Sequence, residues 1–273
     1  MKLAQFFRDK ELSLGIVKEE KLSPLAFTGD FHDWLAAGKP LTTTGTILHL
    51  DQIKLTAPVN RPGKIIAIGL NYAEHAAEGK RDNPEKPLIF AKFPSSIIGP
   101  DNDITWFSKI TEKVDFEAEL AVVIGEKTFS CKSEEALSKV FGYTCGNDVS
   151  ARDLQFGDKQ WIRGKSLNTF CPLGPWLVTA DELTDPQKLA IRSRLNGKIM
   201  QESNTADMIF PVAELVSYLS CHFTLEPGDL IMTGTPSGVG VFREPPVFMK
   251  DGDIIEIEIE DIGTLKNYCR NRN

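Results

Sequence analysis

The chain has 273 residues, of which 41% are hydrophobic and 25% charged. That is enough apolar material for one large domain, or for a main domain with a small companion, and it excludes a disordered chain. The formal net charge of −7 disfavours phosphate backbones, and no run of apolar residues approaches the ~20 that span a bilayer. We therefore expect neither a nucleic-acid nor a membrane partner.

Five cysteines are present, and no two of them form a CxxC motif. An odd number of scattered cysteines argues against a disulfide framework and favours buried thiols in a reducing compartment. The N-terminal residues soon meet charges and lack the apolar core of a signal peptide. We expect a cytoplasmic protein.

Residues 1–60 are predicted to form a small N-terminal domain. Short apolar runs alternate there with turn residues, and residues 31–37 favour a helix that ends at Gly38. Pro58 and the triplet Arg61-Pro62-Gly63 then interrupt the pattern. We place a domain boundary at this point, so that residues 61–273 form the main domain.

Strand signals dominate the main domain. Apolar runs predict strands at 64–69, 88–93, 114–124 and 229–233, and strict alternation predicts another at 253–260. Helices are fewer: one is expected over 134–141 with Ser133 as its cap, and a second after Pro211, with an apolar stripe that begins at Val212. The spacing is not a regular βαβ alternation, so the sequence predicts an α+β fold with a mixed, mainly antiparallel sheet.

The predicted strand 114–124 carries an acidic pattern. Asp115, Glu117 and Glu119 alternate with apolar residues, which places neighbouring carboxylates about 7 Å apart on one face. Carboxylates so placed repel each other, and a cation relieves the repulsion; oxygen ligands suit Mg²⁺, Mn²⁺ or Ca²⁺ rather than zinc. Asp148 is a candidate third ligand. An ordinary exposed strand face and an ordinary turn aspartate explain the same residues.

Residues 71–79 are typical of a short helix closed by Gly79. His75 and Glu78 are three positions apart and share a face of it. A carboxylate beside an imidazole fixes its tautomer and raises its basicity, which suits a general base that activates water. An incidental surface pair has the same spacing. The charged, proline-containing stretch 80–87 that follows indicates that the helix belongs to a mobile lid.

Several motifs follow one another in a fixed order along the chain. They are GLNYAEH (69–75), DFEAELA (115–121), GNDVSARD (146–153), RGKS (163–166), FCPLGP (170–175), NG (196–197), MIF (208–210), GDLIMTGTPSGVG (228–240) and GDIIEIEI (252–259). With these motifs the chain resembles the fumarylacetoacetate hydrolase family over about residues 62–270. Residues 1–60 resemble, more weakly, the small N-terminal domain of many bacterial members.

The resemblance implies a fold, a site and an assembly. The fold is a mixed, barrel-like β-roll with a few packed helices, usually found as a homodimer. The implied metal ligands are Glu117, Glu119 and Asp148; the implied catalytic residues are His75, Glu78 and Lys165; the implied substrate-binding residues are Arg152, Gln155 and Thr235. Asn168 stands where many members carry Asp, and we expect it to tune Lys165.

The implied activity is metal-dependent cleavage of a carbon–carbon bond in a small 2-oxo acid. An acylpyruvate would be hydrolysed through an enolate stabilised by Mg²⁺ or Mn²⁺, with Ca²⁺ as an ion that crystals can hold. Oxaloacetate decarboxylation and 2-hydroxymuconate-type isomerisation or decarboxylation would use the same site. The His75–Glu78 pair favours hydrolysis. A non-catalytic metal- or ligand-binding module is the alternative of another class. The sequence leaves the acyl group, the metal and the pathway open.

Overall fold

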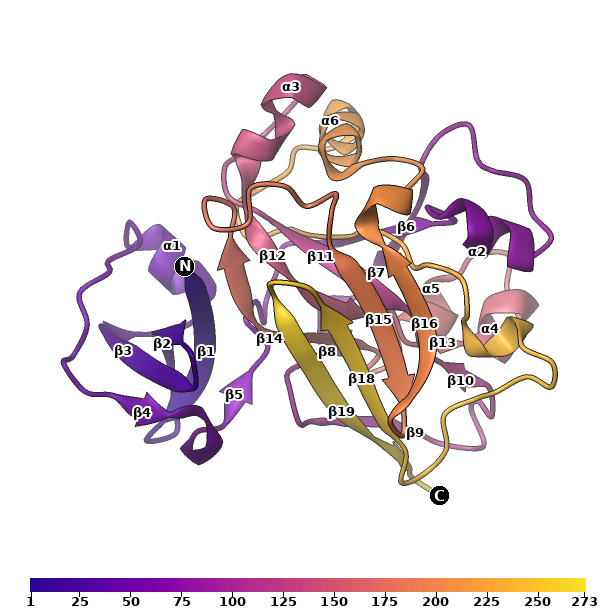
Figure 1. Cartoon of the computed structure of the whole chain (residues 1–273), viewed down its shortest axis with the longest axis horizontal. Coiled ribbons are helices and arrows are strands. Elements are labelled where there is room, and N and C mark those ends of the chain that lie inside the picture. The colour runs from indigo at the N-terminus through magenta and orange to yellow at the C-terminus, as the bar shows by residue number, and fades with distance from the viewer.

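Strands make up most of the regular structure in the computed structural model, which describes all 273 residues (Figure 1). The strands are β1 Lys2–Arg8, β2 Glu11–Lys18, β3 Lys21–Thr28, β4 Leu48–His49, β5 Leu55–Thr56, β6 Ile65–Gly69, β7 Leu88–Lys92, β8 Ile97–Ile98, β9 Asp103–Trp106, β10 Val114–Asp115, β11 Ala118–Ile124, β12 Val140–Asn147, β13 Ser150–Ala151, β14 Cys171–Thr179, β15 Ala190–Leu195, β16 Lys198–Asn204, β17 Leu230–Met232, β18 Ile254–Ile259 and β19 Gly263–Asn271. The α-helices are α1 Phe31–Ala36, α2 Ala73–Glu78, α3 Ser133–Ala136, α4 Arg152–Gly157, α5 Ile162–Lys165 and α6 Val212–His222.

Two large sheets organise these strands. A twelve-stranded sheet has the order β4-β3-β2-β1-β14-β12-β11-β17-β6-β7, with β5 and β8 beside it, and a five-stranded sheet has the order β16-β15-β18-β19-β9. Most pairs are antiparallel; the parallel ones are β17 with β6, β19 with β9, and β14 with β8. The predicted α+β class is confirmed. Neither sheet closes on itself, however, so the structure is an open roll and not a barrel.

The N-terminal residues join the main sheet directly. Strand β1 pairs with β14 through Lys2 opposite Val178 and Leu3 opposite Leu177. Beneath this junction, Leu3, Phe31 and Trp34 share one apolar cluster with side chains of β11 and β14. In Figure 1 the indigo segment forms a lobe beside the rest of the chain. The sheet and its core are continuous across residue 60. The domain boundary near that residue therefore stays a prediction.

Strand β11 lies at the centre of the molecule. Leu120 and Val122 pack into the largest apolar cluster, whereas Ala121 and Val123 pack into the cluster shared with the N-terminal lobe. Every residue from 114 to 124 is therefore buried, and the exposed-strand interpretation of this segment is wrong. Burial of charged side chains on such a strand requires partners within the protein.

Two local predictions need correction. The strand expected over 114–124 is broken after Asp115, and the helix expected to reach residue 141 ends at Ala136, followed by a 3-10 turn at Leu137–Lys139. Val140 instead begins β12, where pairing with β11 overrides local helix propensity. Ser133 is the first residue of the helix, and the N-cap is Lys132, which makes no side-chain cap hydrogen bond. No helix is long and apolar enough to cross a membrane.

Candidate active site

The predicted acidic triad is assembled at the break between β10 and β11. Glu117, Glu119 and Asp148 are all buried and offer carboxylate oxygens that lie within 4.8 Å of one another. Glu117 occupies the break, where its backbone N–H donates to Asn147 Oδ1 (3.0 Å) and its carbonyl accepts from the N–H of Asp148 (3.0 Å). These contacts bring the turn after β12 against the break and so unite the three carboxylates.

Two buried lysines flank the triad. Lys165 Nζ, from α5, donates to Glu117 Oε2 (2.8 Å) and Asp148 Oδ2 (2.7 Å). Lys92 Nζ, at the end of β7, donates to the other Asp148 oxygen at 2.6 Å and also to the Lys165 carbonyl. Asp148 is thus bracketed by two ammonium groups. The sequence analysis identified Lys165 and missed Lys92.

The two glutamates have opposite electrostatic surroundings. Burial alone would raise the pKa of Glu117, but Lys165 and Arg152 outweigh it and lower this pKa to about 2. Burial raises the pKa of Glu119 well above its usual range, and the neighbouring Asp148 and Glu117 raise it further. Glu119 makes one hydrogen bond, accepted from the backbone N–H of Gly234 at 2.9 Å, and has no salt bridge.

This arrangement fits a divalent cation. A buried carboxylate without a cationic partner is costly, and Glu119 is such a group beside two other carboxylates. An all-oxygen donor set of this kind suits Mg²⁺, Mn²⁺ or Ca²⁺. Glu117, Glu119 and Asp148 are therefore the residues that would hold the ion.

The predicted histidine–glutamate pair is formed on α2. His75 Nδ1 lies 2.7 Å from Glu78 Oε1, and His75 is buried. Glu78 accepts a second hydrogen bond from the Gly238 N–H at 2.9 Å, which fixes the carboxylate against the loop after β17. With Nδ1 as the donor to Glu78, the Nε2 atom of the imidazole is the free base.

Arg152 and Gln155 come from α4. Arg152 Nη1 contacts Gln155 Oε1 (2.9 Å) and Glu117 Oε1 (2.7 Å), while its Nε donates to Asp115 Oδ2 (2.8 Å). The buried Nη2 has no partner in the protein. An unpaired guanidinium nitrogen of this kind is suited to an anionic ligand. Asp115, which the sequence placed on the acidic face, is the counter-ion of Arg152 and lies outside the triad.

Thr235 is positioned by a buried amide that the sequence analysis missed. Gln201 Nε2 donates to Thr235 Oγ1 at 2.7 Å, and its Oε1 accepts from the Ala118 N–H at 2.9 Å. Gly234 precedes Thr235 with φ +95°, a conformation that favours glycine. Asn168, by contrast, is exposed and makes no hydrogen bond to Lys165, so the structure gives it no evident role there.

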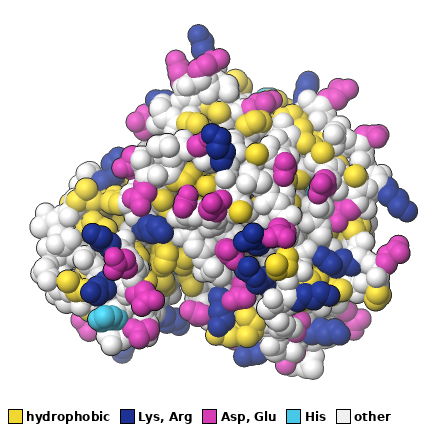
Figure 2. Space-filling model, viewed as in Figure 1, with side chains coloured by type: hydrophobic (Ala, Val, Ile, Leu, Met, Phe, Trp, Pro, Cys, Tyr) yellow, Lys and Arg dark blue, Asp and Glu magenta, His cyan; other side chains and the backbone are white.

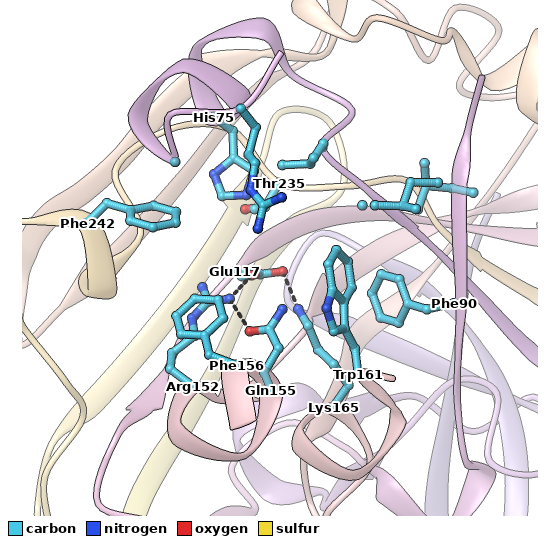
Figure 3. A pocket seen from close by; sticks show the side chains of 16 residues that line it. His75, Phe90, Glu117, Arg152, Gln155, Phe156, Trp161, Lys165, Thr235 and Phe242 are labelled. Atoms are coloured by element: carbon cyan, nitrogen blue, oxygen red, sulfur yellow. Dashed lines mark hydrogen bonds and ion pairs between the residues drawn. The ribbon is translucent and has the colours of Figure 1, made fainter. Parts of the chain in front are cut away.

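A cavity of about 280 Å³ is lined by six of these residues: His75, Glu117, Arg152, Gln155, Lys165 and Thr235. Figure 3 shows His75 and Thr235 on one side of it and Arg152, Gln155 and Lys165 on the other, with Glu117 between them. Apolar side chains, among them Phe90, Phe156, Trp161 and Phe242, line the remaining wall. Arg81, which the sequence analysis did not single out, also lines the cavity.

The fold and the site are those of an enzyme. In an open mixed β-roll, Glu117 of a buried carboxylate triad and His75 of a histidine–glutamate pair line the same small cavity. The chain belongs to the fumarylacetoacetate hydrolase family, since the family model described as "Fumarylacetoacetate (FAA) hydrolase C-terminal" matches residues 64–270.

Named relatives and solved structures agree with this assignment. Bovine "Oxaloacetate tautomerase FAHD2A, mitochondrial" is 48% identical over 84% of the chain and 73% of that protein; its human counterpart is 45% identical over 85% and 74%. The structure of fumarylacetoacetate hydrolase from Exiguobacterium antarcticum has a TM-score of 0.92 at 37% identity. That of 5-carboxymethyl-2-hydroxymuconate delta-isomerase from Mycobacterium smegmatis has a TM-score of 0.84 at 36% identity. Both cover the full length of each chain.

Proposed function

We propose that this enzyme interconverts the enol and keto forms of a small 2-oxo acid, with oxaloacetate as the first substrate to test. The observation that carries the proposal is the placement of His75, hydrogen-bonded to Glu78, on the cavity wall opposite the cations Arg152 and Lys165. Two relatives at 45–48% identity are named oxaloacetate tautomerases, which supports this choice of substrate.

A divalent ion held by Glu117, Glu119 and Asp148 would supply positive charge that stabilises an enolate. The side chains around it bind and orient the substrate. Arg152 offers its unpaired Nη2 to the substrate carboxylate. The ammonium of Lys165 contacts Glu117 and Asp148. It is therefore close enough to the ion site to contact the substrate oxygens as well.

His75 carries the proton in this proposal. Glu78 accepts the hydrogen bond from Nδ1, so that Nε2 can take a proton from the carbon beside the 2-oxo group. The imidazolium then returns that proton to the enolate oxygen, which gives the enol; the reverse sequence gives the keto acid. No water is consumed and no bond between carbon atoms breaks. The apolar wall of the cavity limits access of bulk water to the enolate.

The test follows the decay of the ultraviolet absorbance of the oxaloacetate enol with and without enzyme. His75→Ala should reduce kcat by about 10²–10⁴-fold, the usual contribution of a general base. His222→Ala, which removes an exposed histidine on α6, is the matched control. Chelation should abolish activity and added Mg²⁺ or Mn²⁺ should restore it. Wild-type activity in the His75→Ala variant would refute the proposed role of the dyad.

Hydrolysis of an acylpyruvate is the second candidate, because the same His75–Glu78 pair could deprotonate a water for attack on a distal carbonyl. The two reactions separate in a substrate panel. Production of acetate and pyruvate from acetylpyruvate identifies a hydrolase, whereas loss of CO₂ from oxaloacetate identifies a decarboxylase. An enzyme that only accelerates enol decay is a tautomerase. Metal binding without turnover of any of these would favour the binding-module alternative.

We also propose a homodimer. Leu88, the first residue of β7, and Phe93, which follows this strand, are both exposed. Strand β7 is an edge strand of the large sheet, and exposed apolar groups at a sheet edge favour association. Sedimentation equilibrium would give the mass in solution. The cytoplasmic location stays a prediction, since two of the relatives are named as mitochondrial proteins.

A further inference from the structure

Arg81 is the one cation of the cavity wall that has no acidic partner in the protein. Arg152 is paired with Asp115 and Glu117, and Lys165 with Glu117 and Asp148. Arg81 lines the same cavity, is exposed, and makes neither a salt bridge nor a side-chain hydrogen bond to the protein. Its guanidinium is therefore available to a ligand.

The backbone holds Arg81 at a defined place. Its backbone N–H donates to the Ala76 carbonyl of α2 at 2.9 Å. At the same end of the helix, the N–H groups of Gly79 and Lys80 donate to the carbonyls of His75 and Ala77. Arg81 is thus attached to the helix that carries the catalytic pair. A group bound by Arg81 would stay on the His75 side of the cavity.

The buried part of the site cannot neutralise a second carboxylate. Four fully buried carboxylates, Asp115, Glu117, Glu119 and Asp148, face three buried cations, Lys92, Arg152 and Lys165. These side chains therefore carry a net charge of −1, which a bound divalent ion would change to +1. That positive charge matches the single carboxylate of a 2-oxo monoacid. A dicarboxylate brings one more negative charge into a partly apolar cavity, and that charge needs another cation.

We propose that Arg81 binds the distal carboxylate of the substrate and so selects 2-oxo dicarboxylates over 2-oxo monoacids. This inference rests on the proposed function. The guanidinium can form two parallel hydrogen bonds with a carboxylate, a geometry that a lysine cannot reproduce. The proximal carboxylate remains the ligand of Arg152.

Two unreactive ligands test the inference by binding alone. N-Oxalylglycine carries an oxalyl head and a distal carboxylate, and N-methyloxamate is the same molecule without that carboxylate. Calorimetric titration in the presence of Mg²⁺ would give both dissociation constants for the wild type, Arg81→Met, Arg81→Lys and the control Lys80→Met. Lys80 is the exposed neighbour of Arg81 and does not line the cavity.

We expect Arg81→Met to weaken N-oxalylglycine about tenfold, the lower end for a charge-assisted hydrogen bond at a partly exposed position. N-Methyloxamate should change by less than about twofold, Arg81→Lys should lie between, and Lys80→Met should match the wild type. Equal weakening of both ligands, or of neither, overturns the inference and leaves the proposed function standing. Failure of both ligands to bind the wild type overturns the proposed function and this inference together. The corresponding kinetic readout is a rise in KM for oxaloacetate in Arg81→Met with no change for 2-oxobutyrate.

Discussion

Replacing Glu117 and Glu119 by glutamine should change the stability of the metal-free protein in opposite directions. Glu117 is neutralised by Lys165 and Arg152, whereas Glu119 has no cationic partner. Removing the charge of Glu117 takes one of two carboxylate partners from each cation, so that Lys165 keeps only Asp148 and Arg152 keeps only Asp115. Removing the charge of Glu119 relieves its repulsion by Asp148 and Glu117, which together with burial raises the pKa of that carboxyl.

The change in the free energy of unfolding expected for Glu119→Gln follows from proton linkage. A carboxyl whose pKa rises on folding binds more protons in the folded state, so its contribution to stability falls as pH increases above the unfolded value of 4.5. Each pH unit is worth about 1.4 kcal/mol, which sets a ceiling of about 3 kcal/mol at pH 7. Metal-free Glu119→Gln should be more stable than the wild type by up to this amount, and the difference should vanish near pH 4.5. Its amide oxygen can still accept from the Gly234 N–H.

Glu117→Gln should instead lose about 3–5 kcal/mol, the usual cost of removing one partner of a buried ion pair. The assay is urea denaturation of chelator-treated protein between pH 5 and 8, followed by the shift in Tm on adding Mg²⁺ or Mn²⁺. Both variants should lose most of the metal-induced shift, because a metal that binds only the folded state stabilises it in proportion to its affinity. A metal-free Glu119→Gln variant that is less stable than the wild type at pH 7 would refute this electrostatic assignment.

Three further predictions concern residues around the site and in the N-terminal lobe. Lys92→Met should destabilise the metal-free protein by about 3–5 kcal/mol in urea denaturation, because Asp148 loses one of its two buried ammonium partners; unchanged stability would contradict this. Asp115→Asn should raise KM more than it lowers kcat, since Arg152 loses the carboxylate that orients its Nε; an effect on kcat alone would argue against such a role. Burial, aided by Arg61, lowers the pKa of His32 despite the opposing charge of Asp30. The Tm of the wild type should therefore fall as pH drops below 6.5, and His32→Gln should flatten that fall.

The carboxylate triad could be predicted from the sequence, but its geometry could not. Alternation placed Glu117 and Glu119 on one face, and both are indeed buried beside Asp148. The alternation also predicted an unbroken strand, whereas Glu117 sits at a break. The break is held by the side-chain oxygens of Asn147 and Gln201, which accept hydrogen bonds from the backbone N–H groups of Glu117 and Ala118, far away in sequence. Such long-range amide contacts leave no local pattern from which they could be predicted.

The sequence around Lys92 carries a signal of a buried charged contact that the prediction of the site did not use. It ends the apolar run at Leu88–Lys92, and a lysine in a strand that is otherwise predicted to be buried needs an acidic partner. That reasoning could have predicted a charged contact, but not that Asp148 would supply it. Arg81 offered no such signal, because it lies in a charged stretch that resembles any exposed loop.

The anchoring of α2 bears on how the cavity opens. The sequence favoured a mobile lid, yet three contacts tie this helix to the loop after β17. Glu78 accepts from the Gly238 N–H at 2.9 Å, Glu74 accepts from Ser237 Oγ at 3.0 Å, and the His75 ring lies beside Phe242. A lid that moved α2 alone would break all three contacts and release Glu78 from the loop that orients it. Opening must therefore either carry the loop 237–242 with α2 or leave the helix in place and move only the segment after Gly79. The second route breaks the hydrogen bond from the Arg81 N–H to the Ala76 carbonyl and displaces Arg81, while the His75–Glu78 pair stays formed. Substrate entry and distal recognition would then belong to one segment and proton transfer to another.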